Sequence, residues 1–188
     1  TLALLEKLKD DPSEYVRRSV GNHLNDIAKD HPQLVIKTCR RWWQDGSPER
    51  RWIVQRALRT LVKAGDPDAL AVLGYGSAQV ELTNFSLTPA VLQLGEKLTL
   101  AFALHNPTDT EQNVVIDFVI HFVKANGQTS GKVFKLKTAV LTPHDSLTIE
   151  KSHPIRPITT RTYYPGTHRA EIQVNGQRLG ELSFELIV

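Results

Sequence analysis

Residues 11–32 have the sequence DPSEYVRRSVGNHLNDIAKDHP, in which apolar and polar positions recur at the spacing of an α-helix. Asp11 is a suitable helix cap, Pro12 suits the first helical position, and Glu14 is placed as the acid of a capping box. We therefore expect a helix that begins at about residue 12. The apolar positions that would pack inward on this helix are Val16, Val20, Leu24 and Ile27.

A second face of the same helix combines basic and amide side chains. Its members are Arg18, Asn22, Asn25 and Lys29. Such side chains suit contact with an anionic partner, because cations and amide groups can both bond phosphate oxygens. The sequence therefore predicts that this face is a contact surface, whereas the plainer alternative is an ordinary solvated helix surface.

A related helix follows about 38 residues later. The run Gly46-Ser47-Pro48-Glu49 ends one helix and starts the next, and setting Val16 on Val54 aligns Arg18 with Arg56. A period near 40 with paired helices is typical of HEAT-type repeats, which bury their apolar faces by stacking on neighbours. Since residues 2–9 resemble the end of another helix, we expect the C-terminal part of a longer solenoid.

The hydrophobic period changes from 3.6 to 2 after Gly74 and Gly76, which marks a domain boundary. We expect residues 1–76 to form HEAT-like helical repeats and residues 77–188 to form a second, all-β domain. Alternating apolar residues predict strands over 98–104, 116–122, 170–174 and 182–188. About seven such strands in roughly 110 residues are typical of an immunoglobulin-like β-sandwich.

The sequence predicts a specific structure for two turns of this domain. Asn175-Gly176 predicts a tight type I′ hairpin between the last two strands. Tyr163-Tyr164 lies where such sandwiches often have a tyrosine corner, in which a tyrosine hydroxyl bonds nearby backbone. Both features are structural, so the sandwich is predicted to be an interaction or orientation module.

Composition limits the classes of function. No segment approaches the about 18 uninterrupted apolar residues of a membrane span. Cys39 is the only cysteine, which fits a cytoplasmic protein and, among its apolar helical neighbours, a small buried hydrophobe. Residues 1–76 have 13 Lys and Arg against 10 Asp and Glu, whereas residues 77–188 have 10 of each. The excess charge thus lies in the helical part and favours an anionic partner there.

Motifs for chemistry within these residues are few. There is no glycine-rich phosphate loop and no nucleophile elbow, so we expect no cofactor. The histidines lack metal-binding spacing, so we also expect no metal. Asp26, three residues after His23, is the weak candidate for a catalytic acid or base, and the sandwich histidines, His168 among them, resemble ordinary surface residues.

The run from Tyr15 to Pro32, followed by a sandwich, resembles the AlkC branch of the AlkC/AlkD DNA alkylation repair glycosylases. The resemblance implies HEAT-like repeats that hold duplex DNA in a basic concave channel, and hydrolytic excision of N-methylated bases such as 3-methyladenine or 3-methylcytosine. It places the catalytic Asp in a repeat before this helix. The Trp and Arg that approach DNA in the AlkD relatives correspond to Asn22 and Asn25 here.

We accordingly expect a monomer that binds the phosphate backbone of double-stranded DNA and has no catalytic residue other than the weak candidate Asp26. The predicted DNA-binding residues are Arg17, Arg18, Asn22, Asn25, Lys29, Arg40, Arg41, Arg50, Arg51, Arg56 and Arg59. The alternative is a non-enzymatic scaffold of helical repeats and sandwich that binds a protein partner. Exposed, contiguous Trp42, Trp43 and Trp52 would favour the scaffold, and the prediction is that they are core residues.

Overall fold

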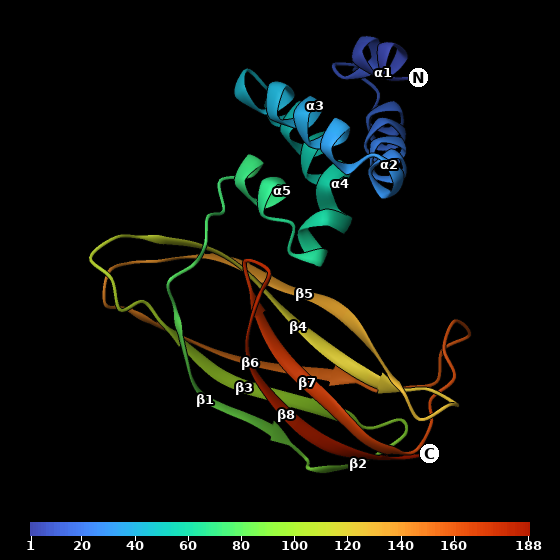
Figure 1. Ribbon diagram of the computed structural model, residues 1–188, viewed down its shortest axis with the longest axis vertical. Helices are drawn as coiled ribbons and strands as arrows, with labels where there is room; N and C mark the ends of the chain where they lie inside the picture. Colours follow the sequence, from blue (N-terminus) through green and yellow to red (C-terminus); the bar gives the residue numbers. More distant parts are fainter. The chain divides into compact units, whose positions relative to one another are not determined.

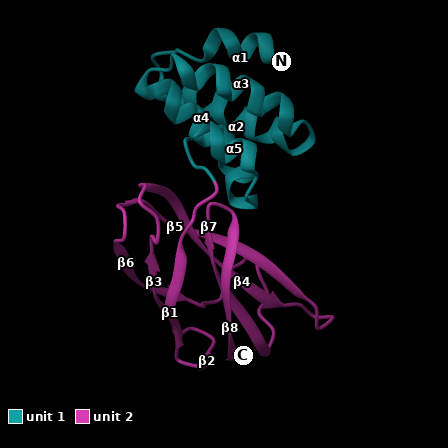
Figure 2. Cartoon of the chain, turned by 60° about the vertical axis from the view of Figure 1, so that its left-hand side comes forward, with its two compact units in different colours: residues 1–76 teal, residues 77–188 magenta.

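The computed structural model describes residues 1–188, which divide into two compact units, Thr1–Gly76 and Ser77–Val188 (Figure 2). The first unit is entirely helical. Its helices are α1 (Leu2–Leu8), α2 (Glu14–Asp30), α3 (Pro32–Gln44), α4 (Pro48–Ala64) and α5 (Pro67–Val72). None of them combines the length and the apolar character that crossing a membrane requires.

The start of α2 differs from the sequence expectation by two residues. The helix begins at Glu14 with Ser13 as its N-cap residue, because the Asp11 carboxylate accepts a hydrogen bond from the Ser13 backbone N–H at 2.8 Å. Asp11 therefore closes the turn before the helix and does not cap the helix itself. The start of α4 is as predicted, since the Ser47 hydroxyl accepts from the backbone N–H of Arg50.

The helical core lies between α2, α3 and α4. Val20, Leu24, Trp42 and Leu58 are almost fully buried in it. Cys39 is also buried, and burial raises the pKa of its thiol to about 12. The prediction that Cys39 is a small packed hydrophobe is confirmed, because a thiol with so high a pKa has almost no reactive thiolate at neutral pH.

The second unit is an immunoglobulin-like sandwich of two sheets (Figure 1). One sheet has the order β1-β3-β6 and the other the order β2-β8-β7-β4-β5. The strands are β1 (Glu81–Thr88), β2 (Val91–Gln93), β3 (Lys97–His105), β4 (Gln112–Val123), β5 (Thr129–Leu141), β6 (Ser146–Pro154), β7 (Gly166–Val174) and β8 (Gln177–Ile187). All pairs are antiparallel except the short β2, which runs parallel to β8.

Alternation along the strands explains the sandwich core. In β3, every second residue from Leu98 to Leu104 is buried and the residues between them are partly exposed. Phe118 of β4 and Phe184 of β8 fill the space between the sheets. The predicted hairpin at Asn175-Gly176 is confirmed, because both residues have positive φ and join β7 to β8 directly.

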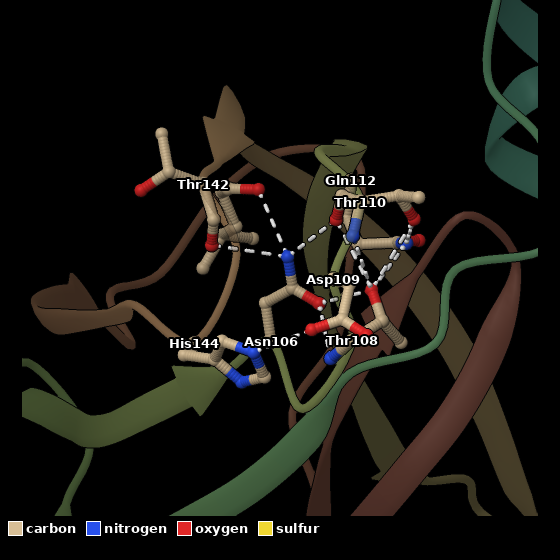
Figure 3. A network of polar contacts seen from close by, with 8 residues as sticks. Asn106, Thr108, Asp109, Thr110, Gln112, Thr142 and His144 are labelled. Atoms are coloured by element: carbon tan, nitrogen blue, oxygen red, sulfur yellow. Dashed lines mark hydrogen bonds and ion pairs between the residues drawn. The ribbon is translucent and has the colours of Figure 1, made fainter.

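Buried polar groups fix the loops of the sandwich. Asn106, which is fully buried, donates from Nδ2 to the carbonyl oxygens of Thr110, Leu141 and Thr142 (Figure 3). Its Oδ1 accepts from the backbone N–H and hydroxyl of Thr108. One side chain thus joins the β3–β4 loop to the β5–β6 loop.

The sequence expectation for the histidines is wrong at His168. Its ring is buried, with Nε2 3.1 Å from the carbonyl oxygen of Tyr164 and Nδ1 accepting from the Val123 N–H. The corner predicted to contain a tyrosine hydroxyl bond therefore has a histidine bond to the Tyr164 backbone, while Tyr163 packs edge-on against Phe122. Turn composition alone gives no sign of this burial.

Candidate nucleic-acid interface

The candidate interface is formed by α2 and α4, which pack against each other and are joined by two side-chain hydrogen bonds. The Asn22 Oδ1 accepts from the Arg56 Nε at 2.9 Å, and the Asn25 Oδ1 accepts from the backbone N–H of Thr60 at 3.3 Å. Gly21 allows this close approach, because a Cβ added there would lie 3.1 Å from the Cβ of Arg56. The amides therefore join the two helices.

These bonds correct the predicted stripe on α2. Asn25 is only 3% exposed, so it is a packing residue and not part of an open contact face. Asn22 is half-buried and uses its oxygen to position Arg56. Arg18 and Lys29 are exposed as predicted. Period alone does not separate the face toward a neighbouring helix from the face toward solvent, which explains the error.

Arg56 and Arg59 of α4 are the centre of the candidate interface. The Arg56 guanidinium lies 5.5 Å from the centre of the Trp52 ring, and Arg59 donates from Nη1 to the Arg56 carbonyl at 2.7 Å. Neither arginine forms an ion pair with a carboxylate. Burial, and then the charge of Arg56, lower the pKa of Arg59. Two neighbouring cations without an ion-paired acid produce a positive potential that an anion would relieve.

Most other predicted cations already have acidic partners. Arg18 pairs with Glu14 at 2.5 Å and Lys29 with Asp26 at 2.8 Å, each within α2. The remaining pairs are Arg40 with Asp68, Arg41 with Glu6, and Arg50 with Asp10. A carboxylate at this distance cancels much of the positive potential of its partner, so these cations are weaker candidates for anion contact.

Two further predicted cations have different roles. Arg17 donates from Nη1 to the carbonyl oxygens of Asp11 and Pro12, so it closes the segment before α2. Arg51 is exposed, lies over the Trp43 ring at 5.4 Å and has no carboxylate partner. Arg51 therefore resembles Arg56 and Arg59, because all three are arginines without a carboxylate partner.

The three tryptophans lie in three different environments. Trp42 is buried and donates from Nε1 to the Glu6 carboxylate at 2.9 Å. Trp43 is partly buried, and Trp52 is 36% exposed beneath the Arg56 guanidinium. The core prediction is confirmed for Trp42 and wrong for Trp52. The spacing Trp52–Arg56 is i, i+4, which was the available sequence signal for their contact.

Asp26 lacks the surroundings of a catalytic carboxyl group. It is exposed, and the hydrogen bond and charge of Lys29 lower its pKa. A general acid at neutral pH requires the opposite change, since its carboxyl group must retain a proton. His23, three residues earlier, is also exposed.

The sandwich brings together one group of possible metal ligands that the sequence analysis missed. His121, Glu171 and Glu181 come from three adjacent strands, and their ligand atoms lie within 4.8 Å of one another. Both carboxylates are, however, bound by arginines, Glu171 by Arg178 and Glu181 by Arg169. The group is therefore a network of ion pairs on the outside of the sheet, and strand pairing, not sequence spacing, creates it.

The fold and this surface together define a class: a two-unit protein in which a helical unit with unpaired cations precedes an immunoglobulin-like sandwich. Residues 81–188 match the family described as "Uncharacterised protein YhaZ, C-terminal Ig-like domain". The chain belongs to this family and to the AlkC branch of the DNA alkylation repair proteins.

Individual relatives agree with this assignment. The chain is 38% identical over 186 residues to the uncharacterised protein YhaZ of Bacillus subtilis (strain 168), which covers 98% of this chain and 51% of that protein. It is 42% identical to the Pseudomonas fluorescens alkylpurine DNA glycosylase AlkC, solved bound to DNA containing an abasic site analog. That likeness has a TM-score of 0.96 and covers 100% of this chain and 52% of AlkC. The chain thus spans about half the length of both relatives.

More distant structures share the fold alone. A β-glucosidase from Listeria innocua has a TM-score of 0.50 and 21% identity, covering 61% of this chain and 17% of the enzyme. An identity this low carries no inference about activity.

Proposed function

We propose that this chain is the DNA-binding C-terminal part of a DNA alkylation repair glycosylase. The observation that carries the proposal is the likeness to the DNA-bound AlkC of Pseudomonas fluorescens over the whole of this chain. The whole protein would excise N-methylated bases such as 3-methyladenine or 3-methylcytosine from duplex DNA. A base with a positive charge leaves readily, so such an enzyme mainly stabilises the oxocarbenium-like sugar and positions water.

Within this chain the proposed role is to hold the phosphate backbone. Arg56 and Arg59 have no ion-paired acid, and Asn22 fixes the Arg56 side chain before any ligand arrives. A fixed guanidinium loses less conformational freedom on binding phosphate than a mobile side chain does. Phosphate contacts fix the register of a duplex without reading its sequence, so binding should be independent of sequence.

The helical unit is proposed to consist of HEAT-type repeats, with α2 and α4 as equivalent helices of successive repeats. The 38-residue offset that aligns Arg18 with Arg56 also aligns the buried Val20 with the buried Leu58. Equivalent helices of stacked repeats pack side by side, as α2 and α4 do. The repeat would thus present Arg18 beside Arg56 to the same ligand.

A salt titration tests the DNA contact. Binding of the 188-residue chain to a fluorescent duplex is measured by anisotropy between 50 and 300 mM NaCl. The combined change Arg56→Gln and Arg59→Gln should weaken binding about tenfold at 100 mM. It should also reduce the slope of log K against log salt by about 2, because each arginine that no longer binds a phosphate lowers the slope by about 1.

The matched control is Arg41→Gln, which removes an exposed arginine that already pairs with Glu6. It should change affinity less than twofold. The proposal fails if the unmodified chain does not bind duplex at 50 mM NaCl, or if the control weakens binding as much as the double variant. In the longer parent protein, Asp26→Asn should leave excision of a methylated base unchanged, because Asp26 is exposed and paired with Lys29.

A further inference from the structure

A cationic cavity lies at one end of the sandwich, and no residue of its wall belongs to the proposed DNA contact. Its volume is about 400 Å³, and its walls come from the end of β4, the start of β5 and the β6–β7 connection. Figure 1 shows the β4–β5 and β6–β7 connections at the same end of this unit. The polar residues of the wall are Lys124, Ser130, Arg161, Thr162 and Tyr164. Two are cations, and none is a carboxylate.

Arg161 is held in place from two sides. Its backbone N–H donates to the Ile158 carbonyl at 3.3 Å, and the two residues form an isolated antiparallel β-bridge. Its guanidinium carbon lies 3.9 Å from the centre of the Phe122 ring, and Phe122 is itself buried. A cation stacked on a fixed aromatic face has a defined orientation. Arg161 is therefore preorganised at the cavity.

His168 holds the two walls of the cavity at a fixed separation. Its Nδ1 accepts from the Val123 N–H at the end of β4, and its Nε2 bonds the Tyr164 carbonyl on the opposite connection. Accepting at Nδ1 requires the neutral ring with the proton on Nε2. Burial lowers the pKa of His168, which favours this neutral form. The walls are thus joined by a buried side chain rather than by exposed loops alone.

One polar atom of the Arg161 side chain lacks a partner. The Nη1 of Arg161 is buried and has no hydrogen-bond acceptor. Leaving an N–H of a charged group buried without an acceptor is unfavourable, and such groups in native proteins usually have a bound water or ion. The side chain that carries this nitrogen lines the cavity.

We propose that this cavity is a binding site for a phosphate monoester. The charge of a dianionic phosphate matches the two cations Lys124 and Arg161, and the Arg161 nitrogens can bond two phosphate oxygens. The hydroxyl of Ser130 can donate to a further oxygen. A volume of about 400 Å³ also leaves room for an organic group beside the Tyr164 ring. This site does not depend on the DNA-binding proposal.

Nuclear magnetic resonance of the 188-residue chain tests the site. Inorganic phosphate, adenosine monophosphate and dimethyl phosphate are each titrated at constant ionic strength while the Arg161 Nε–H and Ser130 amide signals are followed. The first two probes should give saturable shifts at millimolar concentration or below. Dimethyl phosphate, which has a single charge, should bind at least tenfold more weakly.

Three variants identify the residues responsible. Arg161→Gln should weaken phosphate binding at least tenfold, and Lys124→Gln, which changes an exposed side chain, should weaken it about threefold with the fold intact. Arg156→Gln is the matched control, because Arg156 is an exposed arginine of the same connection that does not line the cavity. It should bind phosphate as the unmodified chain does.

Several results would overturn this assignment. Shifts that do not saturate, or that sodium chloride reproduces, would mean that the cavity contains only solvent. Equal loss in Arg156→Gln would mean a general charge effect, and equal binding of dimethyl phosphate would exclude a site for monoesters. Lys124→Gln keeps the test valid if Arg161→Gln fails to fold, since an unchanged affinity in that variant also contradicts the proposal.

Discussion

At the scale of single residues, burial gives the same residue type opposite roles. His144 is exposed and contacts Asp109, whereas His168 is buried and joins two backbone segments. His153 packs against the rings of Phe134 and Phe118, at 4.4 and 5.3 Å between ring centres. Neighbouring sequence does not separate these three cases, because the neighbours that matter come from other strands.

His153 should make the stability of the chain depend on pH. Burial, and then the charges of Lys151 and Lys132, lower the pKa of His153 to about 4, below the value of about 6.5 expected in the unfolded chain. Between these two values the unfolded state binds a proton that the folded state does not. Stability contributed by the neutral ring is therefore complete above pH 6.5 and is lost as the pH falls toward 4.

Urea unfolding at pH 7.0 and pH 4.5 measures this effect. Between pH 7.0 and pH 4.5 the free energy of unfolding should fall by about 2 kcal/mol more in the unmodified chain than in His153→Phe. This figure is smaller than the full pKa difference implies, because the ring is partly exposed and solvent screens its charge. His144→Gln, which removes an exposed histidine, should retain the pH response of the unmodified chain. If unmodified chain and His153→Phe lose equal stability, the ring is not protonated on unfolding as argued.

At the scale of elements, the contact between α2 and α4 determines which predicted residues face solvent. Gly21 brings the helices close enough for Asn22 and Asn25 to bond α4, which removes Asn25 from the surface and fixes Arg56 on it. A glycine in the middle of a helix costs about 1 kcal/mol relative to alanine in the free helix. Glycine at position 21 is explained by the aliphatic part of the Arg56 side chain, which occupies the space that a larger residue would need.

Gly21→Leu should separate the two helices. A side chain at this position would meet the Cβ, Cγ and Cδ atoms of Arg56 at 3.1 to 3.2 Å from its first carbon, so we expect a loss of about 2 kcal/mol in unfolding free energy. Gly21→Ala is the matched control, because better helix propensity offsets most of the crowding and the change should stay within about 1 kcal/mol. Urea unfolding followed by circular dichroism compares them. A leucine variant as stable as the unmodified chain would show that the helices are not closely packed there.

At the scale of the whole molecule, each unit has a hydrophobic core of its own. The sandwich core consists of residues between Ala78 and Leu186, and the helical core of residues between Leu5 and Val72. A unit can fold independently when its hydrophobic core consists only of its own residues.

The fragment 77–188 should therefore fold alone. We expect a β-sheet circular dichroism spectrum, dispersed amide resonances and one cooperative unfolding transition, with about 5 kcal/mol or more of unfolding free energy. Asn106→Ala serves as a control for specific packing, since it removes the bonds between two loops and should weaken the fragment measurably. A fragment without dispersed resonances would mean that the sandwich depends on the rest of the chain.

The sequence by itself was sufficient for the order of the elements. The change from period 3.6 to period 2 after Gly76, the Ser47-Pro48 helix start and the Asn175-Gly176 hairpin all depend on neighbouring residues, and local backbone physics determines them. The family likeness was also visible in the run from Tyr15 to Pro32. These features required no knowledge of which elements meet.

Only the tertiary structure decided which polar groups remain available to a ligand. Asn25 became a packing residue and Arg56 a fixed, half-buried cation because α2 meets α4. Lys124 and Arg161 came together because two distant loops share one end of the sandwich. Availability depends on the partners that other elements supply, through burial and charge compensation. Periodicity within one segment carries no information about those partners.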